Sequence, residues 1–169
     1  MLNKLLPDFY FEKFDDVTPE FLKKNGIKTL LLDVDNTIAP YEQATPDERI
    51  RAWLLALEKS GVAYAFISNN SSDRRINIFN ESIGAPAFAK SGKPFAKKNI
   101  GKALKALGRD LEGAAFMGDQ IFTDVCAGKF CGMKAILVPP IKDKASLFFK
   151  FKRSLEKPIL KHYFKTRNN

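Results

Sequence analysis

The sequence is poor in the residues that build disulfide frameworks and zinc sites. Its 169 residues include two cysteines, Cys126 and Cys131, and one histidine, His162. The cysteine spacing fits neither common zinc-binding pattern, and the histidine is distant from both along the chain. A disulfide-stapled domain and a zinc ribbon are therefore excluded, and we expect two plain thiols in a reducing cytoplasm.

Long apolar runs are missing as well. No stretch approaches the roughly 20 apolar residues that a membrane-spanning helix needs. The amino-terminal sequence MLNKLLPDFYFEKF has no apolar run followed by a small-residue cleavage site, so we expect no signal peptide. The length fits one domain with a sizeable core. A content of 45% hydrophobic and 28% charged residues is ordinary for a globular protein.

Acidic residues are scarce in the last part of the chain. The formal net charge of the chain is +9. Residues 142–169 contain nine basic and two acidic residues, which gives this segment a net charge of +7 and leaves +2 for residues 1–141. This distribution predicts a nearly neutral body and a basic segment that faces a negatively charged partner. We therefore divide the chain into an apolar and aromatic amino-terminal segment (1–28), a core (29–141) and a basic amphipathic carboxy-terminal segment (142–169).

Strand and helix patterns alternate through the core. Continuous apolar runs predict five buried strands, in TLLLDV, VAYAFIS, PAFAK, GAAFMGD and KAILVPP. Helical patterns lie between them over 45–61, 73–84, 94–108 and 123–132. The first of these helices opens with a capping box of Thr45 and Glu48, and the third with Pro94. The alternation predicts a single α/β Rossmann-like domain, a parallel five-stranded sheet with helices on both faces.

Polar side chains follow the predicted strands at the points where these end. They are Asp33 and Asp35 after the first strand, Ser68 after the second, Lys93 after the third, and Asp119 and Asp124 after the fourth. Parallel α/β sheets bind ligands beyond the carboxyl ends of their strands. Taken singly, each residue can be a turn former, a helix cap or a solvated charge. Their joint occurrence at successive strand ends favours a binding site.

A calcium loop does not explain the first of these motifs. The stretch DVDNTIAPYEQA lacks a glycine at its sixth position, and Ala44 stands where a bidentate glutamate is expected.

The residues quoted above resemble the four motifs of the haloacid dehalogenase-like phosphatases. The matching elements are DVDNT from Asp33, the serine of ISNN, Lys93-Pro94, and GDQIFTD from Gly118. The resemblance spans about Thr29 to Pro139. More narrowly, the chain resembles the small capless branch that includes phosphatidylglycerophosphate phosphatases and their bacterial relatives. One predicted helix fills each interval where family members carry a cap domain, so we expect no cap.

The resemblance implies a covalent route for phosphate ester hydrolysis. Asp33 would be the nucleophile that forms an aspartyl-phosphate, and Asp35 would protonate the leaving oxygen and then activate water. Ser68 and Lys93, with Asn69, would bind the phosphoryl oxygens.

The resemblance also implies a Mg²⁺ cofactor. Its ligands would be the carboxylate of Asp33, the backbone carbonyl of Asp35 and the carboxylate of Asp119, with waters completing the shell. Asp124 would hold those waters or orient Lys93. The cation would neutralise the nucleophile and the phosphate, so that one anion can attack another.

An uncapped site suits a phosphate carried by something large, such as a protein, a nucleic acid or a lipid head group. In KASLFFKFKRSLEK, Leu147, Phe148, Phe151 and Leu155 share a helical face, with Lys150, Lys152, Arg153 and Lys157 around them. A basic, aromatic amphipathic segment of this kind can lie in an anionic membrane interface. Alternatively, the same faces pack on the domain or on another subunit. The segment lacks the patterns typical of nucleic-acid binding.

These observations lead to one preferred function and three alternatives. We expect a Mg²⁺-dependent phosphatase of phosphatidylglycerophosphate, cytoplasmic and peripheral at the inner face of the cell membrane. The first alternative is a phosphatase of a soluble ester, such as a nucleotide, a sugar phosphate or a phosphoprotein. The second is a receiver-like phosphoacceptor module, although a receiver carries its phosphoacceptor on a later strand. The third is a basic adaptor with a relict site, which the intact motifs disfavour. The oligomeric state stays open.

Overall fold

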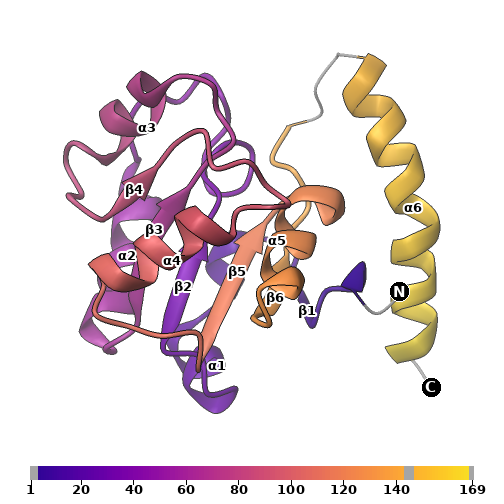
Figure 1. The fold of residues 1–169 in the computed structure, drawn as a ribbon, viewed down its shortest axis with the longest axis horizontal. Helices are drawn as coiled ribbons and strands as arrows, with labels where there is room; N and C mark the ends of the chain where they lie inside the picture. Colours follow the sequence, from indigo (N-terminus) through magenta and orange to yellow (C-terminus); the bar gives the residue numbers. More distant parts are fainter. Residues whose placement is uncertain (1–3, 143–146, 168–169) are drawn as a thin grey trace.

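The computed structural model describes residues 4–142 and 147–167, and Figure 1 shows their arrangement. The strands are β1 (Phe9–Tyr10), β2 (Thr29–Leu32), β3 (Ala63–Ile67), β4 (Ala87–Phe88), β5 (Ala114–Gly118) and β6 (Lys134–Leu137). The α-helices are α1 (Pro19–Lys24), α2 (Glu48–Lys59), α3 (Asp73–Asn80), α4 (Lys97–Ala106), α5 (Cys126–Phe130) and α6 (Leu147–Arg167). A 3₁₀ turn, η2, spans Phe14–Asp16, and a π-helical turn, η3, spans Ile121–Val125.

The strands form one parallel sheet in the order β1-β6-β5-β2-β3-β4. The predicted α/β fold is therefore confirmed, but the predicted number of five strands is wrong, because β1 adds a sixth at the edge. Phe9 pairs with Ile136, and Tyr10 pairs with Leu137. A strand of two residues has no periodicity that a sequence could reveal, and only its pairing with β6 defines it.

Successive residues of the central strand β2 face opposite sides of the sheet, as the period of two in a strand requires. Leu30 and Leu32 pack with buried residues of α1, α2 and α3, whereas Leu31 packs with buried residues of α4 and α5. The prediction of helices on both faces of the sheet is therefore confirmed (Figure 1). Within residues 4–142 no cap domain is inserted into the core.

Helix α2 begins later than the sequence predicts. Asp47, not Thr45, is the N-cap residue, and its carboxylate accepts a hydrogen bond from the Ile50 amide at 2.9 Å. The predicted capping box is therefore wrong. Aspartate is at least as good an N-cap as threonine, and the choice of Asp47 leaves Pro46 outside the helix.

The bounds of three other helices also differ from the prediction. Helix α3 ends at Asn80 rather than near Gly84, and the Asn80 side chain exchanges two hydrogen bonds with the backbone of Ala85. Helix α4 begins at Lys97 rather than at Pro94. The short helix predicted over 123–132 consists of the π-helical turn η3 followed by α5. Each difference lies at a helix end, where local signals compete with loop contacts.

The two cysteines lie in and directly after helix α5. Cys126 is buried, Cys131 is partly buried, and both are free thiols, as expected. Burial raises the pKa of both thiols above the ordinary value, so they stay protonated at neutral pH.

Helix α6 lies along the β1 and β6 edge of the sheet (Figure 1). Ile159 and Leu160 pack against the cluster built on Ile121 and Leu137, and Tyr163 is buried. One face of this helix therefore belongs to the core of the domain. Across the described residues, no helix combines the length and the apolar character that a bilayer crossing requires.

A second stripe of α6 points away from the domain. Leu147, Phe151 and Leu155 recur every fourth residue and are 84%, 62% and 46% exposed. The interpretation that Phe151 and Leu155 cover the core of their own domain is therefore wrong. The side chain of Phe148, which the sequence places on the same face, lies outside the described residues.

Candidate active site

The central strands converge on one edge of the sheet. Strand β2 lies between β3 and β5, and the residues that follow these three strands are Asp33, Ser68 and Asp119. At this point the connections that leave neighbouring strands run to opposite faces of the sheet. Open α/β sheets bind ligands at such a point. A cavity of about 330 Å³ opens there, lined by Asp33, Asp35, Tyr41, Ser68, Asn69, Asn70, Ser71, Lys93, Gln120, Thr123, Phe149 and Lys152.

Lys93 lies between two carboxylates at the base of this cavity. Its Nζ atom is 2.6 Å from Asp33 Oδ1 and 2.7 Å from Asp124 Oδ1, and all three side chains are buried. The hydroxyl of Thr37 donates a hydrogen bond of 3.1 Å to Asp33 Oδ2. The lysine compensates part of the cost of burying the two carboxylates.

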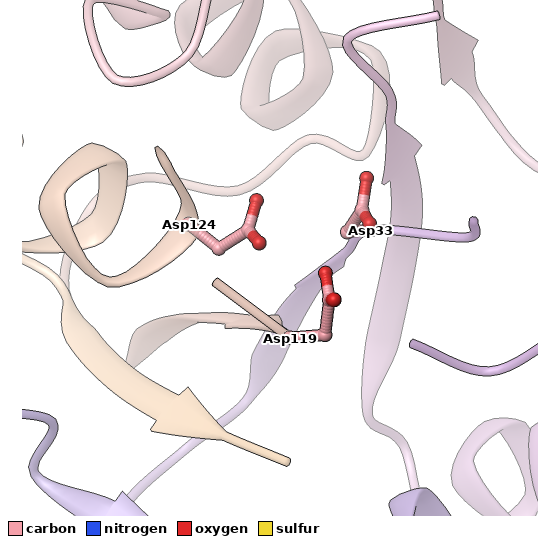
Figure 2. Close-up of side chains that lie close together, drawn as sticks. All are labelled: Asp33, Asp119 and Asp124. Atoms are coloured by element: carbon pink, nitrogen blue, oxygen red, sulfur yellow. The ribbon is translucent and has the colours of Figure 1, made fainter. Parts of the chain in front are cut away.

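A third carboxylate completes a buried acidic cluster. Figure 2 shows Asp33, Asp119 and Asp124 with their carboxylates turned toward a common space. Each offers one oxygen, and these oxygens lie within 4.8 Å of one another. A β-carbon on Gly118 would collide with the Asp124 carboxyl, so glycine at this position allows Asp124 to approach β5.

The electrostatics of the cluster show an excess of negative charge. Burial raises the pKa of Asp33 to about 8, against the opposing effect of Lys93. Burial and the neighbouring Asp124 raise the pKa of Asp119 to about 6. Burial alone would lower the pKa of Lys93, but Asp124 and Asp33 outweigh it and hold the pKa above its usual range. Carboxylates this close together favour an additional cation.

The donor atoms fit a hard divalent cation. The cluster supplies carboxylate oxygens without histidine or thiolate, which is the ligand type that Mg²⁺ prefers. Asp124 Oδ1 is buried and has Lys93 as an ion-pair partner, yet it accepts no hydrogen bond from the described residues. Asp124 Oδ2 accepts a hydrogen bond of 3.0 Å from the Gln120 amide.

The carboxylate of Asp35 lies apart from this cluster. Its Oδ2 accepts a hydrogen bond of 3.2 Å from the Asn70 side chain, and its Oδ1 is 3.2 Å from Arg75 Nε. Asp35 also lines the cavity. Sequence reasoning missed both partners, although Arg75 belongs to the helix that directly follows the Ser68 loop.

Ser68 and Asn69 occupy the next strand end but have different surroundings. The Ser68 hydroxyl is buried and accepts a hydrogen bond of 3.1 Å from the Asn70 amide. Asn69 Oδ1 accepts hydrogen bonds of 2.8 Å from the Lys93 amide and the Ser91 hydroxyl, and its Nδ2 donates one of 3.0 Å to the Lys93 carbonyl. Asn69 thus holds the loop that carries Lys93. Its predicted contact with phosphate stays a prediction.

Helix α6 contributes side chains that sequence reasoning did not place in the site. Arg153 forms an ion pair with the Asp119 carboxylate, and Lys152 Nζ donates a hydrogen bond of 2.9 Å to Gln120 Oε1. Glu156 is buried, and its Oε2 atom lies 2.8 Å from Arg153 Nη1. Its Oε1 atom accepts a hydrogen bond of 2.8 Å from the Ile121 amide. No local signal identifies these contacts, because they depend on how α6 docks.

Comparison with known proteins gives three findings. The family model of mitochondrial PGP phosphatase matches residues 2–142. The chain is 32% identical over 161 residues to the probable phosphatase YqeG of Bacillus subtilis (strain 168), covering 95% of this chain and 92% of the relative. Its fold is similar to that of an uncharacterized protein from Listeria monocytogenes serotype 4b, with a TM-score of 0.53 and 18% identity over 71% of this chain and 85% of that one.

The fold and the site define a capless phosphatase of the haloacid dehalogenase-like class. Within that class, the chain belongs to the mitochondrial PGP phosphatase family. The receiver-like module and the relict adaptor are therefore set aside.

Proposed function

We propose that this phosphatase hydrolyses the terminal phosphate of phosphatidylglycerophosphate at a membrane surface, with Mg²⁺ as its cofactor. The observation that carries the proposal is the position of α6. The same helix lines the uncapped cavity through Phe149 and Lys152 and presents the exposed stripe of Leu147, Phe151 and Leu155. The family match supports a lipid substrate. We place the protein in the cytoplasm, peripheral at the inner face of the cell membrane, as part of the same proposal.

The side chains of the cavity support a covalent mechanism in two steps. In the first, an Asp33 oxygen forms a bond to phosphorus, the bond from phosphorus to the glycerol oxygen breaks, and Asp35 gives its proton to that oxygen. In the second, water attacks phosphorus, Asp35 takes a proton from the water, and the bond to Asp33 breaks. Inorganic phosphate leaves, and both carboxyl groups return to their starting state.

Other residues hold and neutralise the reacting groups. Lys93 and Ser68 would bind the phosphoryl oxygens as charge develops on them, with Asp124 orienting the lysine. Mg²⁺, held by the carboxylates of Asp33 and Asp119 and the backbone carbonyl of Asp35, would offset the negative charge of the nucleophile and the phosphate.

We expect turnover of an aryl phosphate to stop in chelator and to return when Mg²⁺ is added. Asp119→Ala should raise the Mg²⁺ concentration for half-maximal activity by about tenfold or more, because it removes a carboxylate from the buried cluster. The exposed Asp16→Ala variant is the control, with an unchanged requirement. Full activity in chelator would contradict the metal assignment.

The stripe on α6 provides the means of membrane attachment. Aromatic and aliphatic side chains at four-residue spacing can enter the interface of a bilayer. Each lysine or arginine near an anionic surface adds about 1 kcal/mol of attraction. Lys150 and Lys157 are exposed on the same helix. We therefore expect attachment to the membrane to weaken at an ionic strength of about 1 M, where the Debye length falls to about 3 Å.

This attachment is testable without removing the helix. Deleting α6 would take away the buried Tyr163 and Glu156 and destabilise the domain. The combined substitutions Leu147→Ser, Phe151→Ser and Leu155→Ser change only exposed side chains. We expect them to preserve aryl phosphate turnover and the melting temperature, and to lower lipid hydrolysis in anionic vesicles by about tenfold or more, since apolar burial in the interface is lost.

The matched control replaces three exposed apolar residues elsewhere, Leu55, Ile78 and Leu111, with serine. It should bind vesicles as the wild type does in co-sedimentation. Equal vesicle binding by the stripe variant would argue against docking through α6. A wild type that hydrolyses soluble esters but not the vesicle lipid would move the substrate to the soluble class.

A further inference from the structure

A second cavity lies beside the catalytic one. It has a volume of about 340 Å³ and is lined by Asn36, Pro140, Lys142, Phe149, Lys150, Arg153 and Lys157. Phe149 lines both cavities, and Arg153 extends from the second one to the Asp119 carboxylate. Because of these shared residues, we call the second cavity the basic pocket and treat it as an extension of the site.

One wall of the basic pocket is hydrogen-bonded to the loop that carries Asp33 and Asp35. Asn36 directly follows Asp35, and its Nδ2 donates a hydrogen bond of 2.7 Å to the Lys142 carbonyl. The Lys142 amide donates one of 2.9 Å to Asn36 Oδ1, and the Ile141 amide donates one of 3.0 Å to the Asn36 carbonyl. Three hydrogen bonds thus hold residues 141–142 at a defined place relative to the nucleophile loop, and α6 supplies the opposite wall.

The basic pocket has positive charge that the described residues leave partly unneutralised. Its lining includes four cationic side chains and, among the described residues, no carboxylate. Arg153 is paired with Asp119 and Glu156, and Lys142 is paired with Glu42. Lys150 and Lys157 make no hydrogen bond or ion pair with any residue that the structure describes. Lysines without such partners among the described residues, beside an arginine, have the chemistry that suits a phosphate group.

We infer that the basic pocket binds the second, non-reacting phosphate of a substrate that carries two. This inference rests on the proposed function and deepens it, since the proposed lipid joins a phosphodiester to the reacting monoester through one glycerol. The monoester enters the acidic cavity, and the diester lies against Lys150 and Lys157. Binding energy from this remote group selects a substrate with two phosphates over a simple monoester.

The test compares two soluble substrates, so that no bilayer is involved. Glycerophosphoglycerol phosphate carries both phosphates without acyl chains, and glycerol phosphate carries the monoester alone. We expect the wild type to have the higher kcat/KM for the first. Lys150→Ala combined with Lys157→Ala should reduce this preference by about tenfold or more, because charge-assisted contacts to the diester are lost.

The matched control is Lys161→Ala combined with Lys165→Ala. It removes the same charge from exposed positions of α6 outside the basic pocket, and the preference should be preserved. A wild type without preference, or an equal loss in both variants, would overturn the inference. So would a pocket variant that keeps its preference in solution and loses only vesicle binding, because the pocket would then hold neighbouring lipid head groups.

A binding measurement separates this inference from the proposed function. Calorimetric titration with glycerophosphoglycerol, which has the diester but no monoester, should show binding to the wild type and to the control, and not to the pocket variant. No binding to the wild type would refute the inference. A wild type that binds glycerophosphoglycerol through the basic pocket and yet leaves phosphatidylglycerophosphate in vesicles intact would refute the proposed lipid substrate. That result would support the inference that the basic pocket binds a phosphodiester.

Discussion

Replacing Asp33 with asparagine should abolish turnover while the protein stays folded. The amide is nearly isosteric. Its oxygen can accept the hydrogen bond that Lys93 donates to Asp33, and its NH2 group can donate one to the Thr37 hydroxyl in place of the bond that Thr37 donates to Asp33. It cannot form a stable bond to phosphorus, so the covalent route is closed. We expect a loss of at least about a thousandfold in kcat/KM, or about 4 kcal/mol in the barrier.

Steady-state assays with an aryl phosphate, paired with a thermal melt, measure both parts of this expectation. The exposed Asp16→Asn variant controls for the loss of one negative charge and should behave as the wild type does. Residual activity within about tenfold of wild type, a barrier change of only about 1.4 kcal/mol, would rule out Asp33 as the nucleophile.

Replacing Asp35 with asparagine should separate the two chemical steps. An aryl phosphate has a leaving group that needs little protonation, so phosphoryl transfer to Asp33 can proceed without the acid. Release needs a base to activate water, and general acid–base catalysis typically contributes about a hundredfold or more. We therefore expect a fall of that size in steady-state turnover and the accumulation of an aspartyl-phosphate.

The trapped intermediate is measured by intact mass at acid pH, where an acyl phosphate survives quenching. The double variant Asp33→Asn/Asp35→Asn is the control and should carry no phosphoryl group. An adduct in the double variant would place the intermediate on another residue. Unchanged turnover in the single variant would show that the acid–base assignment is wrong, and that the contacts of Asp35 with Asn70 and Arg75 are structural.

The core of the fold could be predicted from sequence because its signals are local. The strands β2, β3 and β5 are continuous apolar runs, and glycine, proline and capping residues separate them from helices. The parallel arrangement follows from the alternation of strands and helices. Strand β1 could not be predicted, because Phe9 and Tyr10 are extended only through their pairing with β6.

The candidate site likewise has a part that the sequence predicts and a part that only the structure shows. The residues at strand ends, Asp33, Ser68 and Asp119, could be expected to meet, because parallel strands bring their carboxyl ends to one edge of the sheet. The contact of Asn69 with phosphate stays a prediction, and the structure adds that the Asn69 side chain holds the loop that carries Lys93. Motif position places a residue near a site, whereas the hydrogen bonds of its side chain depend on the loop that folds against it.

By itself, the sequence determined the α/β class, the motifs of the phosphatase family and the strand ends where Asp33 and Asp119 meet. Those features depend on periodicity and spacing within short stretches of chain. The tertiary structure alone decided which face of α6 packs on the domain, and thereby brought Arg153 to Asp119 and Lys150 and Lys157 to the basic pocket. An amphipathic helix has several faces that satisfy its own sequence pattern, and only packing against residues distant in the chain selects among them.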